Sequence, residues 1–427
     1  MVQGSNEAGG AASSFPALRA FASRDFRLLW AGAFISFVGS WVQNVAQGWL
    51  IYDLTRDPEK LALVGLFQML PVTLLGPFAG TFADRFNKRY LLAGTQIVFA
   101  ANAAILGSLY SWGTLQVWHI YVGALCVGIA GTMEVPGRQS IVSRVVPPED
   151  LSAAVPLNAM TFNFARIVGP SIGGWLLATW GVSVCYWLNA FTYLGLIGAA
   201  LAIRADLSSR YAGGQPVLDL VLEGMRFTLR DRRLKTLFLM ECAISVFALF
   251  YLNLMPAIAR DVLGLGKQGL GTAMTMIGFG AISALIMVLL LSQKPIKGLL
   301  VKSSMIGLGL ALMGLSLCRS PGPAFICLFF AGFFAITQFN TTNTLFQLLS
   351  PDRLRGRVIA MHVWALSGIG PVGIYGFGWL AKRIGLAEAL ATGATLVLIS
   401  AALAIWKGDP LREVAPHPQH QAEPKTS

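Results

Sequence analysis

The sequence predicts an all-α polytopic membrane protein with twelve transmembrane helices in two six-helix parallel repeats, and three observations lead to this prediction. First, 55% of the 427 residues are hydrophobic and only 12% are charged, with a mean hydropathy of +0.64, whereas a soluble domain is about 25% charged. Second, apolar runs of about 20 residues, each long enough to cross a bilayer as a helix, recur along nearly the whole chain. They lack the alternating polarity of membrane-spanning strands. Third, the two halves of the chain resemble each other.

The transmembrane helices follow the apolar runs, which short polar loops separate. We expect them at roughly 28–52, 61–83, 90–112, 116–144, 151–179, 182–203, 234–259, 269–292, 299–319, 323–349, 356–381 and 386–406.

The chain is expected to divide into five segments. Residues 1–23 lack the apolar stretch of a signal peptide, and with the tail 407–427 they predict disordered cytoplasmic ends. Between them lie a six-helix bundle at 24–203, a cytoplasmic linker at 204–233 and a second six-helix bundle at 234–406. The linker carries apolar residues at helical spacing, which predicts an amphipathic helix on the membrane surface: Val217, Leu218, Val221, Leu222, Met225 and Leu229.

Lysine and arginine fix the expected orientation. Of the 32 such residues, 24 fall on the side that holds both termini and the loops after even-numbered spans, and seven fall on the other side. Cytoplasmic loops carry this excess, so both termini are expected in the cytoplasm. The net charge of +12 is thereby explained without nucleic-acid binding.

The third observation is an internal repeat. "SRDFRLL" at 23–29 resembles "LRDRRLK" at 229–235, and Gly174-Trp175-Leu176 matches Gly378-Trp379-Leu380 at an offset of 204 residues; Gly181 and Gly385 share that offset. Repeats of six spans point the same way. Such parallel repeats place a binding site at the midplane and give alternating access by rocking.

Two motifs resemble a known family. "GTFADRFNKR" (80–89) resembles the loop signature of the major facilitator superfamily, with matches at Gly80, Asp84, Arg85, Lys88 and Arg89 and with Asn87 where glycine is usual. "GPSIGG" (169–174) resembles the glycine–proline motif of the family's exporters. The stretch around it, 148–181, is similar to the branch that includes the enterobactin exporter and macrolide-efflux proteins. The resemblance as a whole covers about residues 20–407. This resemblance implies a multi-pass protein of the bacterial plasma membrane.

The chain departs from the family pattern at two places. Ala124 stands near the position of the usual span-4 arginine, and the second-half loop "LSQKPIKGLL" (291–300) keeps its bases but lacks the acid. The expected proton coupling therefore does not rest on that arginine.

The resemblance implies a conformational latch. Asp84 is expected to dock against the start of span 11, where Arg353, Arg355 and Arg357 stand beside a helix N-terminus that favours an anion. A solvated loop charge is the alternative. A contact made in one state only would bias the inward–outward equilibrium.

The glycines of spans 2 and 5 are expected to be helix contacts, because small residues allow close approach in lipid. The resemblance implies that spans 2 and 11, and spans 5 and 8, form the interface between the halves. The predicted interface residues are Gly76, Gly169, Pro170, Gly173 and Gly174.

Ionisable residues within spans are costly and usually functional. Glu134 is predicted either to couple proton movement or to pair with Arg138 one turn away or with the loop of Lys88 and Arg89. Arg166 is expected to meet Glu134, to bind an anionic substrate or to gate the cavity. Glu241 is either a coupling residue or a packing acid.

Polar and aromatic residues within spans predict a large amphipathic cavity, although lone amides also join helices. His362 titrates near neutral pH or is a satisfied core histidine. The candidates are Gln43, Asn44, Gln47, Asn158, Phe162, Asn253, Gln338, Asn340, Asn343, His362 and Trp364.

The function that fits best is proton-coupled export of amphipathic small molecules, such as drugs or siderophores, by a monomer in lipid. A lysophospholipid flippase and a non-transporting scaffold remain alternatives. The sequence lacks a Walker A motif and a catalytic constellation, so neither an ATPase nor another enzyme is expected. The five cysteines have no metal-type spacing, and we expect no cofactor or metal.

Overall fold

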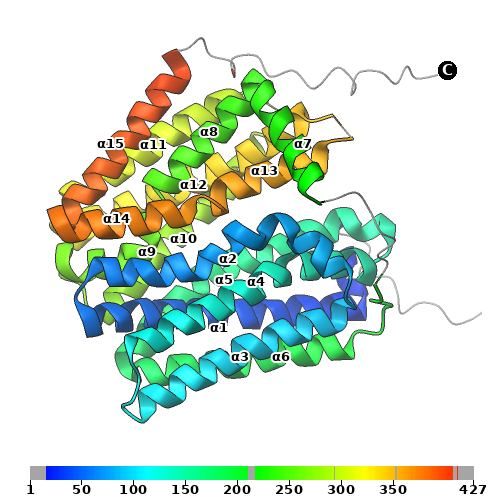
Figure 1. Cartoon of the computed structure of the whole chain (residues 1–427), viewed down its shortest axis with the longest axis horizontal. Coiled ribbons are helices and arrows are strands. Elements are labelled where there is room, and N and C mark those ends of the chain that lie inside the picture. Colours follow the sequence, from blue (N-terminus) through cyan, green and yellow to red (C-terminus); the bar gives the residue numbers. More distant parts are fainter. Residues whose placement is uncertain (1–15, 210–216, 293, 352, 407–410, 412–427) are drawn as a thin grey trace, which may run out of the picture.

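The computed structural model describes residues 16–209, 217–292, 294–351, 353–406 and 411; the side-chain surroundings of residues 16–18, 77, 80, 81, 152, 159 and 217 are not described. Every regular element in this part of the chain is helical (Figure 1). Eleven of the described segments are long and apolar enough to cross a membrane. The twelfth long helix is α5, which carries Arg166 at its middle.

The first half holds six long helices. They are α1 (Arg24–Thr55), α2 (Pro58–Asp84), α3 (Lys88–Ser111), α4 (Val117–Val145), α5 (Leu151–Thr179) and α6 (Gly181–Ala202), with short helices η1 (Pro16–Ala22) and η2 (Pro148–Asp150).

The second half also crosses six times, but two of its crossings are broken. Its helices are α8 (Arg232–Phe247), α9 (Phe250–Ala257), η3 (Ile258–Val262), α10 (Lys267–Leu290), α11 (Lys297–Leu317), α12 (Pro321–Leu349), α13 (Arg355–Ser367), α14 (Gly370–Ile384) and α15 (Leu386–Trp406). One expected span is thus α8, α9 and η3, and another is α13 and α14. Pro371 lacks an N–H for the carbonyl of Ser367, which helps to end α13 there.

Helix ends follow local sequence signals. Asp57, Asn87 and Asp231 each accept a hydrogen bond from a first-turn amide of α2, α3 and α8, respectively. Gly181, the first residue of α6, and Gly385, which precedes α15, adopt φ angles of 84° and 101°, where glycine avoids strain. These glycines are the pair that the internal repeat aligned, so the two halves share a backbone turn.

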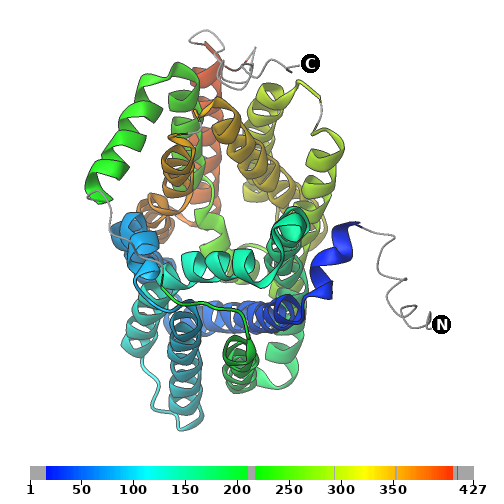
Figure 2. The ribbon, with the colours of Figure 1, turned by 90° about the vertical axis from the view of Figure 1, so that its right-hand side faces the viewer.

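The two six-helix halves pack against each other along a long interface (Figures 1 and 2). Contacts between them run mainly between α5 and α10 and between α2 and α14. Spans 5 and 8 and spans 2 and 11 therefore meet, as the family resemblance implied. We call the end that holds α7 (Val217–Arg230) the linker end; the end with Asp57 and Lys382 is the opposite end.

Residues 16–22 correct the prediction of a disordered segment at 1–23. They form η1, in which Ala20 is fully buried and the Phe21 ring lies 5.4 Å from Phe26 and 5.3 Å from Trp30. Burial of these aromatic rings provides the free energy that orders the segment. Residues 1–15 lie outside the described part, as does the tail except for Leu411, which packs near Gly298.

The predicted amphipathic helix of the linker is present as α7. It packs on α13 and α8, with Val221 and Met225 on the core and Gly224 against the backbone of Arg357. Leu218, Leu222 and Leu229 are exposed. One apolar side of α7 thus packs on the rest of the protein. The exposed leucines are the side chains available for the expected contact with the membrane surface.

Candidate functional site

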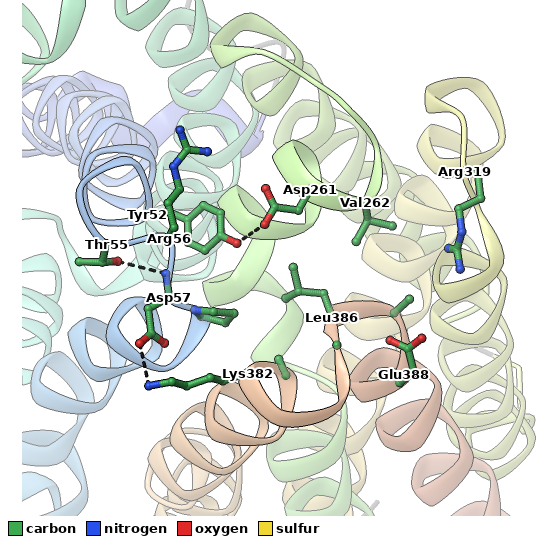
Figure 3. A pocket seen from close by; sticks show the side chains of 14 residues that line it. Tyr52, Thr55, Arg56, Asp57, Asp261, Val262, Arg319, Lys382, Leu386 and Glu388 are labelled. Carbon is green, nitrogen blue, oxygen red and sulfur yellow. Dashed lines mark hydrogen bonds and ion pairs between the residues drawn. The ribbon is translucent and has the colours of Figure 1, made fainter.

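A network of ion pairs joins the halves at the opposite end (Figure 3). Lys382 Nζ, at the end of α14, lies 2.8 Å from Asp57 Oδ2 and 2.9 Å from Glu59 Oε2 of α2. Tyr375 donates a hydrogen bond of 3.1 Å to Glu59. Since α2 belongs to the first half and α14 to the second, these contacts must break before this end can open.

A second pair of contacts connects α1 with η3. Tyr52 donates its hydroxyl to Asp261, and Arg260 Nη1 lies 2.5 Å from Asp53 Oδ1. The guanidinium of Arg260 also stands 5.2 Å above the Trp49 ring, a favourable cation–π distance. Beside these groups lies a cavity of about 570 Å³, bounded by the ends of α1 and α2, η3, Arg319 and the turn between α14 and α15 (Figure 3).

The α1–α2 turn positions Asp57. Arg56 adopts a left-handed backbone with φ of 50°, and Pro58 occupies the first turn of α2. Asp57 Oδ1 then accepts the amide of Glu59 at 2.9 Å, which leaves Oδ2 for Lys382. Burial alone raises the pKa of Asp57, but the hydrogen bonds from Lys382 and the Glu59 amide outweigh burial and hold the pKa below its ordinary value of 3.8.

Sequence reasoning missed this network. It treated Arg260 and Lys382 only as two of the seven basic residues on the side away from the termini. The usable signal was charge complementarity, because Asp53, Asp57 and Glu59 flank the first loop at the opposite end while bases flank the loops of the second half at the same end.

Close contacts between helix backbones also join the two halves. A Cβ on Gly174 of α5 would stand 2.5 Å from the Gly271 Cα of α10, and one on Gly378 of α14 would stand 2.2 Å from Ala62 Cβ of α2. The Pro170 carbonyl also meets Gly271. Gly174 and Pro170 are therefore contacts between the halves.

Three other predicted interface glycines do not contact the second half here. Gly169 packs on Trp41 and Gly173 on Val42, both in α1, because they leave α5 on a different side from Gly174. The nearest atom to Gly76 outside its backbone is Val72 of its own helix. The surroundings of Gly80 lie outside the described part.

The signature loop at the linker end is held within the first half. Lys88 is 1% exposed, with Nζ 2.8 Å from Asp84 Oδ1 and 2.6 Å from the Ala83 carbonyl. Arg89 donates to the Ile203 carbonyl at 2.6 Å. Arg85 caps the end of α2.

The arginines expected to receive Asp84 have a different partner here. Arg353 and Arg357 pair with Glu223 of α7. Asp84 therefore pairs with Lys88 in this conformation, and its docking on the start of α13 in another conformation stays a prediction.

Glu134 and Arg138 form an ion pair inside the first half. Arg138 Nε lies 2.8 Å from Glu134 Oε1, and both side chains are less than a tenth exposed. Arg138 also donates to Asn158 at 3.0 Å and stands 4.8 Å above the Phe37 ring. The i, i+4 spacing thus produces the pair, and the loop bases Lys88 and Arg89 are engaged elsewhere.

Glu241 and His362 meet inside the second half, a pairing that sequence reasoning did not foresee. Glu241 Oε2 of α8 lies 2.5 Å from His362 Nδ1 of α13, and both side chains are almost fully buried. The rings of Phe339 and Phe346 stand 5.2 and 5.3 Å from the imidazole. His362 is therefore a core residue in this conformation, which is one of the two roles expected for it from the sequence.

The predicted cavity amides divide into two groups. Gln43 accepts a hydrogen bond from Asn189 at 2.7 Å, Gln47 from Tyr186 at 3.2 Å, and Gln338 from Ser304 at 2.8 Å. These bonds lie within one half, and Gln43 and Gln338 are buried there, so both join helices in this conformation.

The remaining cavity candidates are less enclosed. Asn44 and Phe162 are exposed, and the others are half-buried: Asn158, Asn253, Asn340, Asn343 and Trp364. Asn340 donates to its own helix, and Asn343 accepts from Gln347. The Trp364 ring stacks on Phe238 at 6.4 Å.

Arg166 does not pair with Glu134. Its Nη2 donates to Asn163 Oδ1 at 3.1 Å, and its Nε is buried without a hydrogen-bond partner. Tyr251 of α9 in the second half lies near enough for an electrostatic interaction. Arg166 therefore stands at the interface of the halves.

Comparison with known proteins supplies the context. Residues 13–424 match the family described as transmembrane secretion effectors. The chain is 25% identical over 344 residues to the staphyloferrin A transporter of Staphylococcus aureus, covering 78% of this chain and 84% of that protein. It is 24% identical over 388 residues to macrolide efflux protein A of Streptococcus pyogenes, covering 87% and 93%.

Solved structures show the same fold at low sequence identity. The nucleoside transporter NupG superposes with a TM-score of 0.74 at 12% identity, over 90% of this chain and all of that one. A D-xylose–proton symporter gives 0.69 at 13% identity, over 92% of this chain and 98% of that one.

Proposed function

The chain belongs to the transmembrane secretion effector family of the major facilitator superfamily, and from that membership we propose that it exports amphipathic small molecules from the cytoplasm by alternating access. The family consists of transporters and not enzymes. The named relatives transport a siderophore or act in macrolide efflux, and both kinds of substrate are small molecules.

The linker end faces the cytoplasm of a bacterial cell in this proposal, with both chain termini on that side of the plasma membrane. The excess of lysine and arginine at this end supports the orientation. The opposite end then faces the outside.

The observation that carries the proposal is the closure of the opposite end by contacts between the two repeats. Lys382 binds Asp57 and Glu59 across the interface, and α5 crosses α10 in backbone contact at Gly174 and Gly271. An exporter must alternate between this closure and one at the linker end. Separable ion pairs and close glycine contacts are suited to that cycle, since both can form and break as rigid halves rock.

Proton influx is the proposed driving force, with the protein acting as a monomer in lipid. Glu134 and Glu241 are carboxylates within membrane helices, and each has one basic partner, Arg138 and His362 respectively. Protonation of Glu134 would leave Arg138 without a counter-ion, and protonation of Glu241 would remove the negative charge beside His362, so each would change the charge of a helix contact. Ala124, near the usual span-4 arginine position, is buried and apolar, so coupling is assigned to these pairs.

Purified protein in proteoliposomes tests the proposal. With an imposed pH gradient, a panel of siderophores, drugs and lysolipids is scored for substrate movement and for substrate-dependent proton flux. Movement of a drug or siderophore that stops when a protonophore collapses the gradient supports it. Undiminished movement after collapse contradicts proton coupling, movement of lysolipids alone indicates a flippase, and movement of none contradicts export of these compounds.

A further inference from the structure

Among the ionisable side chains inside the described membrane helices, not every base is paired with an acid. Glu134 is paired with Arg138 and Glu241 with His362, so both acids already have a basic partner. Arg166 has one neutral amide partner, Asn163, and no carboxylate among the described residues forms an ion pair with it. The interior therefore presents one basic side chain without a counter-ion.

The direction of Arg166 follows from its neighbours on α5. Gly169 and Gly173 face α1, whereas Ile167 and Gly174 face α10 of the second half. With about 100° between successive residues of a helix, Arg166 leaves α5 between these two faces. Its side chain therefore points toward the space between α1 and α10, with Tyr251 of α9 across the interface.

An aromatic surface adjoins this position. Phe162, one turn before Arg166 on α5, is 43% exposed. Its ring lies 5.5 Å from Phe37 and 6.1 Å from Trp41, both of α1. Arg166 thus stands at one end of an aromatic stripe that α1 and α5 form together.

We propose that Arg166 is the anion-binding residue of the substrate site, so that the exported compound is a soluble amphipathic anion. Its carboxylate, sulfonate or phosphate binds the guanidinium, and its apolar body packs on Phe37, Trp41 and Phe162. The inference rests on the proposed function and adds the charge of the substrate.

The physical argument concerns a partly buried cation without a counter-ion, whose Nε atom is enclosed. A guanidinium partly removed from water without a counter-ion is costly, and a bound anion supplies an ion pair with charge-assisted hydrogen bonds. Arg166 Nε has no hydrogen-bond partner and is therefore a donor available to a bound anion. An amphipathic cation would meet the same positive charge, so the site discriminates by repulsion as well as attraction.

Two fluorescent probes with the same apolar body test the charge preference: 1-pyrenebutyrate and its trimethylammonium counterpart. Binding to the purified full chain in neutral detergent is measured by fluorescence anisotropy. We expect the wild type to bind the carboxylate at least about tenfold more tightly than the ammonium compound. Arg166→Gln should lose about tenfold or more of the carboxylate affinity, and Arg166→Lys should retain a clear preference for the anion.

A matched charge control and a competition experiment separate anion binding at Arg166 from a general charge effect and from lipid binding. Lys302→Gln removes one positive charge at the linker end of α11 and should leave both affinities unchanged. Equal carboxylate affinity in Arg166→Gln and wild type would overturn the proposal, as would a wild-type preference for the cation. If Arg166→Gln fails to fold, the preference of the wild type and of Arg166→Lys for the carboxylate probe over the ammonium probe still tests the proposal. Displacement of pyrenebutyrate by phosphatidylglycerol but not by cholate would overturn the soluble substrate in favour of a lipid.

The outcome is independent of the transport test. Export of the cationic probe alone would sustain the proposed function and reject the anionic substrate. Anion-selective binding without movement of either probe would sustain the site and contradict export.

Discussion

At the residue scale, Glu241 and His362 depend on each other because both are enclosed in the second half. Removing one partner leaves the other buried without its polar contact, which typically costs about 1–3 kcal/mol. We expect His362→Ala to lower the unfolding temperature in detergent strongly, and the double variant Glu241→Gln/His362→Asn to lower it much less, since neutral amides can bond each other. A double variant as unstable as His362→Ala would show that packing of the imidazole matters and the ion pair does not.

Asp57 gives a pH dependence whose sign is determined by its lowered pKa. Closure lowers the pKa below 3.8, so the carboxylate stabilises closure fully above that value and loses this effect as the pH falls through the lowered pKa. Spin labels at Leu54→Cys and Ile384→Cys, one in each half, would report the separation at the opposite end in a variant whose five native cysteines are replaced by serine.

We expect this label distance to be constant at neutral pH and to lengthen in strong acid. Asp57→Asn should populate the longer distance already at neutral pH, by about two- to fivefold, which is the range for a partly exposed pair. An acid response that survives unchanged in Asp57→Asn would assign the effect to another carboxylate, with Glu59→Gln as the next variant.

At the element scale, α7 competes with the signature loop for the same arginines. Glu223 of α7 holds Arg353 and Arg357, which are the residues that Asp84 is predicted to contact. We expect Glu223→Gln to shift the ensemble toward closure of the linker end, seen as a shorter distance between labels at Tyr90→Cys and Leu299→Cys. Each pair is partly exposed, so the shift is modest, about 0.2–1 kcal/mol per contact.

Two further variants test whether competition between Glu223 and Asp84 for the arginines causes the shift. Asp219→Asn removes the same charge from an exposed position of α7 and should leave the label distance unchanged. Adding Asp84→Asn to Glu223→Gln should cancel the shift. If Glu223→Gln and Asp219→Asn behave alike, general repulsion and not the ion pairs accounts for the change.

The α5–α10 crossing gives a steric prediction. A methyl group on Gly174 would meet the Gly271 Cα at 2.5 Å, and backbone atoms cannot move aside as a side chain can. Gly174→Ala should therefore open the opposite end, with a cost to the closed state of about 1–3 kcal/mol, read from the Leu54–Ile384 label distance. Gly198→Ala, where nothing lies within 4 Å of the added atom, is the control; an unchanged distance in Gly174→Ala would contradict the crossing.

The helices were predictable from the sequence because span length and apolar content depend on the bilayer and not on neighbouring helices. Boundaries of α5 and α15 agree with the expected 151–179 and 386–406. Helix partners were not predictable in the same way. Gly173 and Gly174 are adjacent, yet one faces α1 and the other α10, and in a bundle that is apolar on several sides the sequence period does not say which helix each side meets.

At the scale of the whole molecule, the same limit explains why the candidate site could be predicted only in part. The major facilitator fold and the exporter family are confirmed, since they depend on patterns that extend along the chain. Long-range pairs such as Glu241 with His362 depend on tertiary packing, and the sequence placed each member in a different role. Arg166 was recognised as unusual because a charge in a span is rare, whereas only the structure shows that no carboxylate among the described residues forms an ion pair with it.

Alternating access requires that the opposite end open during each cycle, and a reversible cross-link tests this requirement. In Asp57→Cys/Lys382→Cys, a short bifunctional methanethiosulfonate would join α2 of the first half to α14 of the second. We expect export in proteoliposomes to stop on cross-linking and to return on reduction, with the uncross-linked double variant as its own reference. Ser111→Cys/Ser183→Cys is the matched control, because these hydroxyls lie 2.7 Å apart at the same end but within the first half. A cross-link there restrains only a rigid bundle, so export should continue. If both cross-links stop export, flexibility within a half is also required; if neither does, the halves do not separate at this end and the rocking mechanism is wrong.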